Sequence, residues 1–275
     1  MNAEISQPEI NFINDSLLKD IRMDGRSLNE NRIFRFKINP LPQCLGSCSI
    51  IYSENQSEII ISLKGQIVEY KNIEELSIGF NLESTKEISD HNSIKQRMIN
   101  LINNMQIKFF KKYNFIILKG KLAWKFNIDV IIIGTISLSE IQQLSFGVRS
   151  CFLYSKIPKI SPSFNPETKK LNYELEEAYV KLDLMEFPLI LSFTFYLTKI
   201  ISDPNESEIH STKNITFISC TQSGIVCAIE KQFESKGNID SLIMKSQEYS
   251  KKMCDKMIVP NNINIDKYLR IDESE

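Results

Sequence analysis

Residues 124–134, which read WKFNIDVIIIG, carry the strand signal on which the prediction of the fold rests. Their β-branched and aromatic side chains predict a strand, and the run Val130-Ile131-Ile132-Ile133 is apolar enough to predict burial on both faces. A shorter strand is predicted at residues 115–118. Apolar side chains at helical spacing predict one helix before this region, at residues 92–110, and one after it, at residues 140–155. Strands enclosed by helices therefore form the predicted centre of the chain.

Toward the N-terminus, the pattern predicts an antiparallel meander. An amphipathic helix is predicted first, and one further strand is predicted between the meander and the central region. The three meander strands are rich in β-branched residues and are separated by turn-forming residues. The predicted elements are a helix at 7–20, meander strands at 33–38, 47–52 and 58–64, and a strand at 76–82.

Beyond Pro158 the composition changes. Residues 161–170 are rich in Pro, Ser, Asn and Lys and predict an exposed loop. Strands grouped together, with helices between the groups, indicate an α+β fold. We predict an N-terminal part at residues 1–158 and a C-terminal part at 159–275 that ends in a charged tail. The remaining predicted elements are strands at 178–182, 189–196, 199–203, 215–220 and 225–230, and a helix at 239–257.

Composition and charge limit the classes of function. The 275 residues are 42% hydrophobic, and 33 basic residues against 34 acidic ones give a formal net charge of -1. A protein that binds nucleic acid alone usually has a basic excess, so any such contact is expected to be local or shared with partners. The six cysteines form no C-x-x-C pair and are predicted to be reduced and mostly buried. With no signal peptide or membrane-length apolar run, the chain is expected in the cytosol or nucleus.

Several short motifs occur in an order that resembles one family. They are R22-M-D-G-R26, Gly46-Ser47 at the start of a strand, WKFNIDV at 124–130, Lys156-Ile157-Pro158, and DPNESE at 203–208 followed by Val226-Cys227 and Lys231. Each is weak alone, but together they extend from about residue 22 to residue 257. This order resembles the RNase PH-like ring subunits of the RNA exosome. The closest branch is the ribosomal-RNA-processing-protein forty-two type.

The resemblance carries several expectations. It implies an RNase PH-like fold of the ribosomal protein S5 domain 2-like kind, in which mixed sheets pack against helices. It implies other RNase PH-like exosome subunits as partners in a hetero-oligomeric ring, with RNA as a further partner and no membrane. It also implies a role in 3′-to-5′ RNA processing and degradation, including that of ribosomal RNA, in the nucleus, the nucleolus and the cytoplasm.

The motifs that the resemblance implies for catalysis are missing. Active members are expected to carry a D-G-G-[ST]-R loop before the second helix, where this chain has GTISLSE at residues 134–140. They also carry an A-D-x-D pattern, whose aspartates align with Ser211 and Lys213. We therefore predict a non-catalytic subunit without cofactor or metal. The alternative is an active phosphate-dependent 3′-to-5′ exoribonuclease that needs Mg²⁺ and phosphate, with carboxylates such as Asp203 or Glu208 replacing the missing pair.

Four basic residues are candidates for RNA binding: Arg22, Arg26, Lys95 and Arg97. For the two arginines, a local salt bridge to Asp20 or Asp24 is an equal alternative. For Lys95 and Arg97, an ordinary solvated helix face is the favoured alternative.

Two further features have a structural and a functional interpretation. Trp124 is expected in the core or at an interface rather than as a base-stacking platform. Asp203, Glu206 and Glu208 could form a carboxylate metal site, but a solvated turn between strands is the favoured interpretation.

Overall fold

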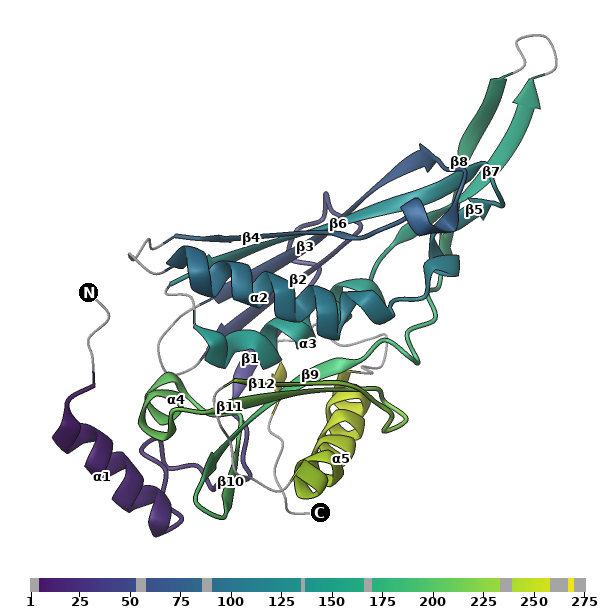
Figure 1. The fold of residues 1–275 in the computed structure, drawn as a ribbon. Helices are drawn as coiled ribbons and strands as arrows, with labels where there is room; N and C mark the ends of the chain where they lie inside the picture. The colour runs from purple at the N-terminus through teal and green to yellow at the C-terminus, as the bar shows by residue number, and fades with distance from the viewer. Residues whose placement is uncertain are drawn as a thin grey trace.

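The computed structural model describes residues 5–52, 58–85, 91–134, 137–165, 170–232, 239–257 and 267–269. Two sheets lie one above the other with helices between them, and a long hairpin extends away from one end (Figure 1). The α+β architecture predicted from the sequence is confirmed. The division at residue 158 stays a prediction. In the described part of the chain, no helix combines the length and apolarity needed to cross a membrane.

The first sheet has seven strands in the order β13-β1-β2-β3-β6-β4, with β5 beside β6. The predicted meander is confirmed, because β1, β2 and β3 pair in sequence and antiparallel. The one parallel pair in this sheet joins β4 to β6, which makes the sheet mixed. Its strands are β1 (Phe34–Ile38), β2 (Gly46–Tyr52), β3 (Glu58–Glu69), β4 (Gly79–Ser84), β5 (Ile116–Leu118), β6 (Leu122–Ile133) and β13 (Lys267–Leu269).

One expectation for the central strand is wrong. Exposure alternates along β6, so that Val130 and Ile132 are buried while Ile131 and Ile133 are 46% and 41% exposed. The described helices lie against one face of this sheet, and side chains of a strand point alternately to its two faces. Trp124 is buried as expected and stacks on Phe126, with ring centroids 6.1 Å apart.

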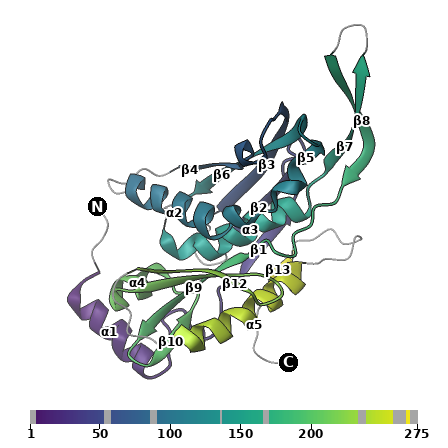
Figure 2. The ribbon, with the colours of Figure 1, turned by 45° about the vertical axis from the view of Figure 1, so that its right-hand side comes forward.

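The second sheet is antiparallel, with four strands in the order β10-β9-β11-β12. Every residue of β11 and seven of the eight in β9 are buried, because helices cover both faces of this sheet (Figures 1 and 2). Its strands are β9 (Leu189–Tyr196), β10 (Lys199–Ser202), β11 (Ile215–Cys220) and β12 (Val226–Gln232).

Helices α2 and α3 lie between the two sheets, while α1, α4 and α5 cover the far side and the edge of the second sheet (Figures 1 and 2). The helices are α1 (Gln7–Leu18), α2 (His91–Met105), α3 (Ile141–Leu153), α4 (Glu206–Thr212) and α5 (Ile239–Met257). Short 3-10 turns are η1 (Ile73–Glu75), η2 (Ile107–Phe109), η3 (Lys112–Phe115) and η4 (Leu138–Glu140).

Helix α3 is buried on all sides, from Ile141 through Phe152. Several of its polar side chains bond to the layers around it. Gln142 accepts the backbone N–H of Ser192 at 3.0 Å, and Ser145 accepts that of Ile190 at 2.8 Å. These bonds tie the helix to β9 and fix its orientation between the sheets.

The hairpin consists of β7 (Ile157–Asn165) and β8 (Lys170–Val180), which pair only with each other (Figure 1). The predicted loop at residues 161–170 is therefore wrong for 161–165 and for 170, while 166–169 lie outside the described residues. A proline has no N–H to donate, but in a two-stranded ribbon each strand has one unpaired edge. Pro162 is thus compatible with the strand, where it stands opposite Tyr173.

Candidate functional site

The two stretches that the resemblance aligns with catalytic motifs come together at one pocket of about 410 Å³. The segment before α3 contributes Ser137 and Leu138. Opposite this segment, helix α4 contributes Glu206, Ile209 and His210, and Lys213 follows it. Helix α2 and strand β12 each contribute one further residue. The lining residues are Ile94, Ser137, Leu138, Glu206, Ile209, His210, Lys213 and Gln232.

Helix α4 positions this side of the pocket and was not predicted from the sequence. It begins with a capping box, in which Asn205 Oδ1 accepts the N–H of Glu208 and Glu208 Oε2 accepts the N–H of Asn205, both at 2.9 Å. It ends at Lys213, whose φ of 53° is left-handed. The pattern N-x-x-E at residues 205–208 was the available sequence signal for this helix.

The segment aligned with the phosphate loop offers little for an anion. The Ser137 hydroxyl accepts the N–H of Ser139 at 3.2 Å, so this amide is already bonded. Two residues beyond Leu138, Glu140 is buried at the start of α3 and its Oε2 has no hydrogen-bond partner among the described residues. Burial raises the pKa of Glu140 to about 7, with Arg32 opposing the shift and Glu206 adding to it. Residues 135–136 lie outside the described residues.

Arg22, the first RNA-binding candidate, is buried and ion-paired within the chain. Its Nε and Nη2 donate to the two carboxylate oxygens of Glu208, at 2.7 and 2.6 Å. Its other N–H groups donate to the carbonyl oxygens of Glu30 at 2.9 Å, Ser202 at 3.0 Å and Asp203 at 3.1 Å. All five donors of the guanidinium are thus used inside the protein.

Arg26, the second candidate, is also buried. It forms the local salt bridge that was the alternative to RNA binding, with 2.7 Å between its Nη2 and Asp24 Oδ2. Burial by itself would raise the pKa of Asp24, but the hydrogen bond and charge of Arg26 lower it overall. For Arg22 the expected salt bridge to Asp20 or Asp24 is wrong, because Arg22 pairs with Glu208, which is 186 positions away in the sequence.

A third arginine, Arg32, completes this buried cluster and was missed in the sequence. It forms a bidentate pair with Asp203, through Nη2 at 2.7 Å and Nε at 3.2 Å. Gln143 of α3 donates to both oxygens of the same carboxylate, at 3.0 and 3.1 Å. Burial favours the neutral acid, but the charge and hydrogen bonds of Arg32 lower the pKa of Asp203 well below its usual range.

The favoured interpretation of the 203–208 stretch as a solvated turn is therefore wrong for two of its three carboxylates. Asp203 and Glu208 are buried in ion pairs, and only Glu206 is exposed. Among the described residues, no group of three or more His, Cys, Asp or Glu side chains is placed to hold a metal ion. A buried carboxylate already paired with arginine is a poor ligand for a cation, so the donor set does not fit Mg²⁺.

Lys95 and Arg97 lie on α2, near Ile94 of the pocket. Lys95 Nζ is 3.2 Å from the carboxylate of Glu83, and Arg97 Nη2 is 3.8 Å from that of Glu230. Both basic side chains are partly exposed, so these are weak surface pairs. RNA binding by these two residues stays a prediction.

No sequence-family profile matches the chain, and no curated protein matches its sequence. Solved structures do match its fold. A chain titled "Archaeal exosome core" shares 15% identity at a TM-score of 0.67, over 90% of this chain and 95% of the other. A chain from the Archaeoglobus fulgidus exosome with RNA bound to the active site gives the same identity and TM-score, over 90% and 97%. Rice (Oryza sativa) Rrp46 shares 13% identity at a TM-score of 0.58, over 86% and 97%. The chain therefore has the predicted RNase PH-like fold.

Proposed function

We propose that this protein is a non-catalytic RNase PH-like subunit of an exosome ring, of the ribosomal-RNA-processing-protein forty-two type. In this role it supports 3′-to-5′ RNA processing and degradation by holding neighbouring subunits and helping to guide RNA. The observation that carries the proposal is the pocket beside α4. Lys213 lines this pocket together with Ile94, Leu138 and Ile209, and the resemblance aligns Lys213 with one of the paired aspartates expected in active members.

The chemistry of this pocket supports a loss of catalysis. Phosphorolysis needs a cradle for phosphate and carboxylates that place a metal ion near the scissile bond. Ile94, Leu138 and Ile209 instead give the pocket an apolar side. Asp203 and Glu208, which would have to replace the missing aspartates, are held by Arg32 and Arg22.

The role in a ring is supported by surface as well as by fold. Two of the similar chains come from exosome complexes, one of them with RNA bound. The β7–β8 hairpin presents Tyr173, Leu175 and Tyr179 with exposures of 48%, 66% and 61%, and exposed apolar side chains gathered on one element are typical of a protein contact. The partners are other RNase PH-like subunits and RNA, in the nucleus, the nucleolus and the cytoplasm.

Native mass spectrometry of the tagged protein from its own cells tests the ring. We expect one particle that contains several different RNase PH-like chains with this one. A protein recovered alone, or only as copies of itself, would contradict the proposal.

A separate assay tests catalysis. The purified chain is incubated with a 3′-hydroxyl RNA oligonucleotide, Mg²⁺ and inorganic phosphate, and we expect no shortening. Release of nucleoside diphosphates that requires both Mg²⁺ and phosphate would establish the active exoribonuclease instead. Glu208→Ala is a poor control, because it also leaves Arg22 buried without its counter-charge. Glu206→Gln is preferable, since Glu206 is exposed in the pocket.

A further inference from the structure

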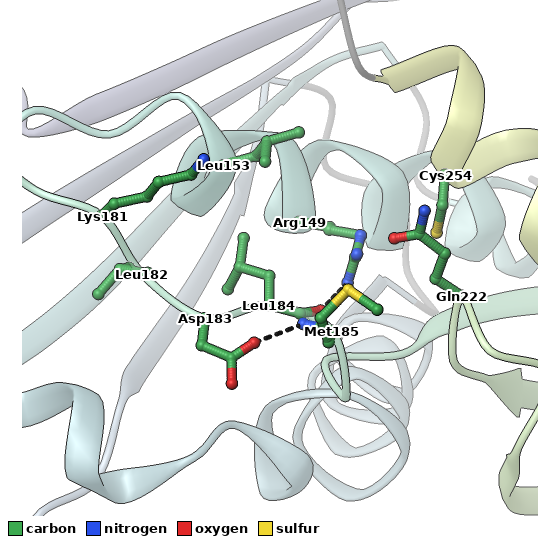
Figure 3. Close-up of a pocket in the computed structure, with 9 residues that line it drawn as sticks. All are labelled: Arg149, Leu153, Lys181, Leu182, Asp183, Leu184, Met185, Gln222 and Cys254. Carbon is green, nitrogen blue, oxygen red and sulfur yellow. Dashed lines mark hydrogen bonds between the residues drawn. The ribbon is translucent and has the colours of Figure 1, made fainter.

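A second pocket, of about 530 Å³, lies at the opposite end of α3 from the first (Figure 3). Arg149 and Leu153 of α3 form one side, and the segment before β9 forms another with Leu182, Leu184 and Met185. Cys254 of α5 closes a third side. This volume suits a small organic ligand or the end of a peptide. None of these residues belongs to the cluster around Asp203.

Arg149 gives this pocket its chemical character, because it is a buried cation that meets no carboxylate in the described part of the chain. The residue is 4% exposed, and no acidic side chain of the described residues pairs with it. Its Nη1 donates to the carbonyl oxygen of Leu184 at 2.8 Å and to that of Phe187. Its Nε has no hydrogen-bond partner among the described residues, although it is fully buried. Buried polar groups are normally bonded and buried charges are normally paired, so the Nε–H group and the charge of this arginine are left uncompensated by the described residues.

The carboxylate nearest in sequence does not supply this charge. Asp183 lines the same pocket, but its Oδ2 is 3.1 Å from Lys111 Nζ and its Oδ1 accepts the N–H of Met185 at 3.0 Å. Cys254 lies beside the guanidinium as a thiol, because burial raises its pKa to about 11. The positive charge of Arg149 is therefore not neutralised by either neighbour. Lys181, exposed at the rim, adds a second positive charge.

We propose that this pocket binds a carboxylate that carries an apolar chain. The two oxygens of the carboxylate pair with the edge of the Arg149 guanidinium that includes Nε, a geometry that a planar fork favours. The apolar chain lies against Leu153, Leu182 and Met185. A single negative charge fits better than a phosphate dianion, because the Asp183 carboxylate is part of the same wall. The ligand is either a free organic acid or the C-terminus of a peptide.

Matched pairs of probes test this proposal on the full chain. Hexanoate with hexanamide represents a free acid, and N-acetyl-Leu-Leu with its C-terminal amide represents a peptide end. We expect at least one carboxylate to bind saturably and to shift the Nε–H resonance of Arg149 in ¹H–¹⁵N spectra, with its amide at least about tenfold weaker. Which carboxylate binds more tightly identifies the source. Equal binding of acid and amide, no binding, or binding that leaves the Arg149 resonance unchanged would overturn the proposal.

Variants are made at two positions, so that the proposal can still be tested if one variant fails to fold. Arg149→Lys keeps the charge but removes the fork, and we expect it to weaken carboxylate binding about tenfold. Because Nη1 also holds the segment before β9, this variant risks unfolding. Met185→Glu instead adds a competing carboxylate at an exposed wall position, with Met185→Gln as its uncharged match. We expect the Glu variant alone to lose the binding, and equal affinity of the two variants would contradict the assignment.

Discussion

At the scale of single residues, the molecule is organised by charges that it buries. Arg22, Arg26 and Arg32 are joined to carboxylates of the 203–208 stretch and to Asp24, and together they attach the N-terminal segment to the second sheet. A buried pair contributes little compared with well-packed apolar residues, but removal of one partner leaves a charge without compensation. A mutation that removes one charge of this cluster should therefore reduce the free energy of unfolding by more than the loss of its hydrogen bonds alone would.

Asp203→Asn should reduce the free energy of unfolding by about 3–5 kcal/mol, because the buried Arg32 would lose the carboxylate with which it forms a bidentate ion pair. Urea denaturation at pH 7 measures this loss. The pKa of Asp203 is lowered from its ordinary 3.8, so its stabilisation is complete above that pH and is lost as the pH falls through the folded value. Glu206→Gln, on the exposed side of α4, is the control and should change stability by less than about 0.5 kcal/mol.

Glu140→Gln should stabilise the protein at pH 8. The folded pKa of about 7 lies above the ordinary value of 4.5, so the folded state holds the proton between these values and loses stability as the pH rises through them. Removal of this acid should recover on the order of 3 kcal/mol at pH 8 and almost nothing at pH 4. Thermal unfolding of both proteins across this range is the measurement. An equal difference at the two pH values would show that Glu140 is not buried in its charged form.

At the scale of elements, the β7–β8 hairpin and helix α4 differ in how firmly they are attached to the rest of the protein. Seven residues suffice for α4, because its capping box and the Arg22–Glu208 pair fix it in place. The hairpin instead extends beyond the sheets, and among its described residues the apolar side chains of Ile157 and Ile160 are buried while several others are exposed. Its stability within the chain should therefore depend on the few residues that reach the core.

Leu175→Ala and Ile160→Ala form a matched test, because the two residues are cross-strand partners in the hairpin. Ile160 is 8% exposed and packs in the core, so its truncation should cost about 2–4 kcal/mol. Leu175 is 66% exposed, and its truncation should cost less than about 0.5 kcal/mol. Chemical denaturation of both variants measures these values. Similar losses for the two would mean that Leu175 is covered in the isolated protein.

At the scale of the whole molecule, helices α2 and α3 connect the two sheets, and α3 makes the more extensive contacts. Helix α3 packs against β2 and β3 on one side and β9 on the other, so its position couples the two layers (Figure 2). Gly46, at the start of β2, sets the closest approach. A Cβ atom there would lie 2.2 Å from the backbone carbonyl oxygen of Cys151 in α3.

Gly46→Ala should therefore separate β2 from α3 and reduce stability by about 1–3 kcal/mol, because a backbone carbonyl cannot move aside as a side chain can. Calorimetric unfolding would measure the change. Gly120→Ala cannot serve as its control, since Gly120 has a φ of 71° that adds strain of its own. Ser155→Ala, at a half-buried position of the same contact region, removes one hydrogen bond to the carbonyl oxygen of Phe152 and should change stability by less than about 1 kcal/mol.

The sequence by itself determined most elements and the antiparallel pairing of the three meander strands. The predicted bounds of β9, β11 and α5 agree with the structure, because apolar period and turn residues are local properties of the chain. It also indicated the two stretches that form the pocket beside α4. The RNase PH-like family was expected from the motifs, and the fold comparisons confirm the fold that this family implied.

Only the tertiary structure decided which charges are buried and which residues they meet. Arg22 was equally compatible with RNA and with a neighbouring aspartate until Glu208, 186 residues away, was placed against it. The unpaired Arg149 gave no sequence signal, since one arginine in an apolar helix has the same local pattern whether it is exposed or buried. The hairpin was not predicted because residues 161–165 favour a loop locally, and only their pairing with β8 makes them a strand. Burial and ion pairing depend on contacts between segments far apart in the chain, and local propensity carries no record of them.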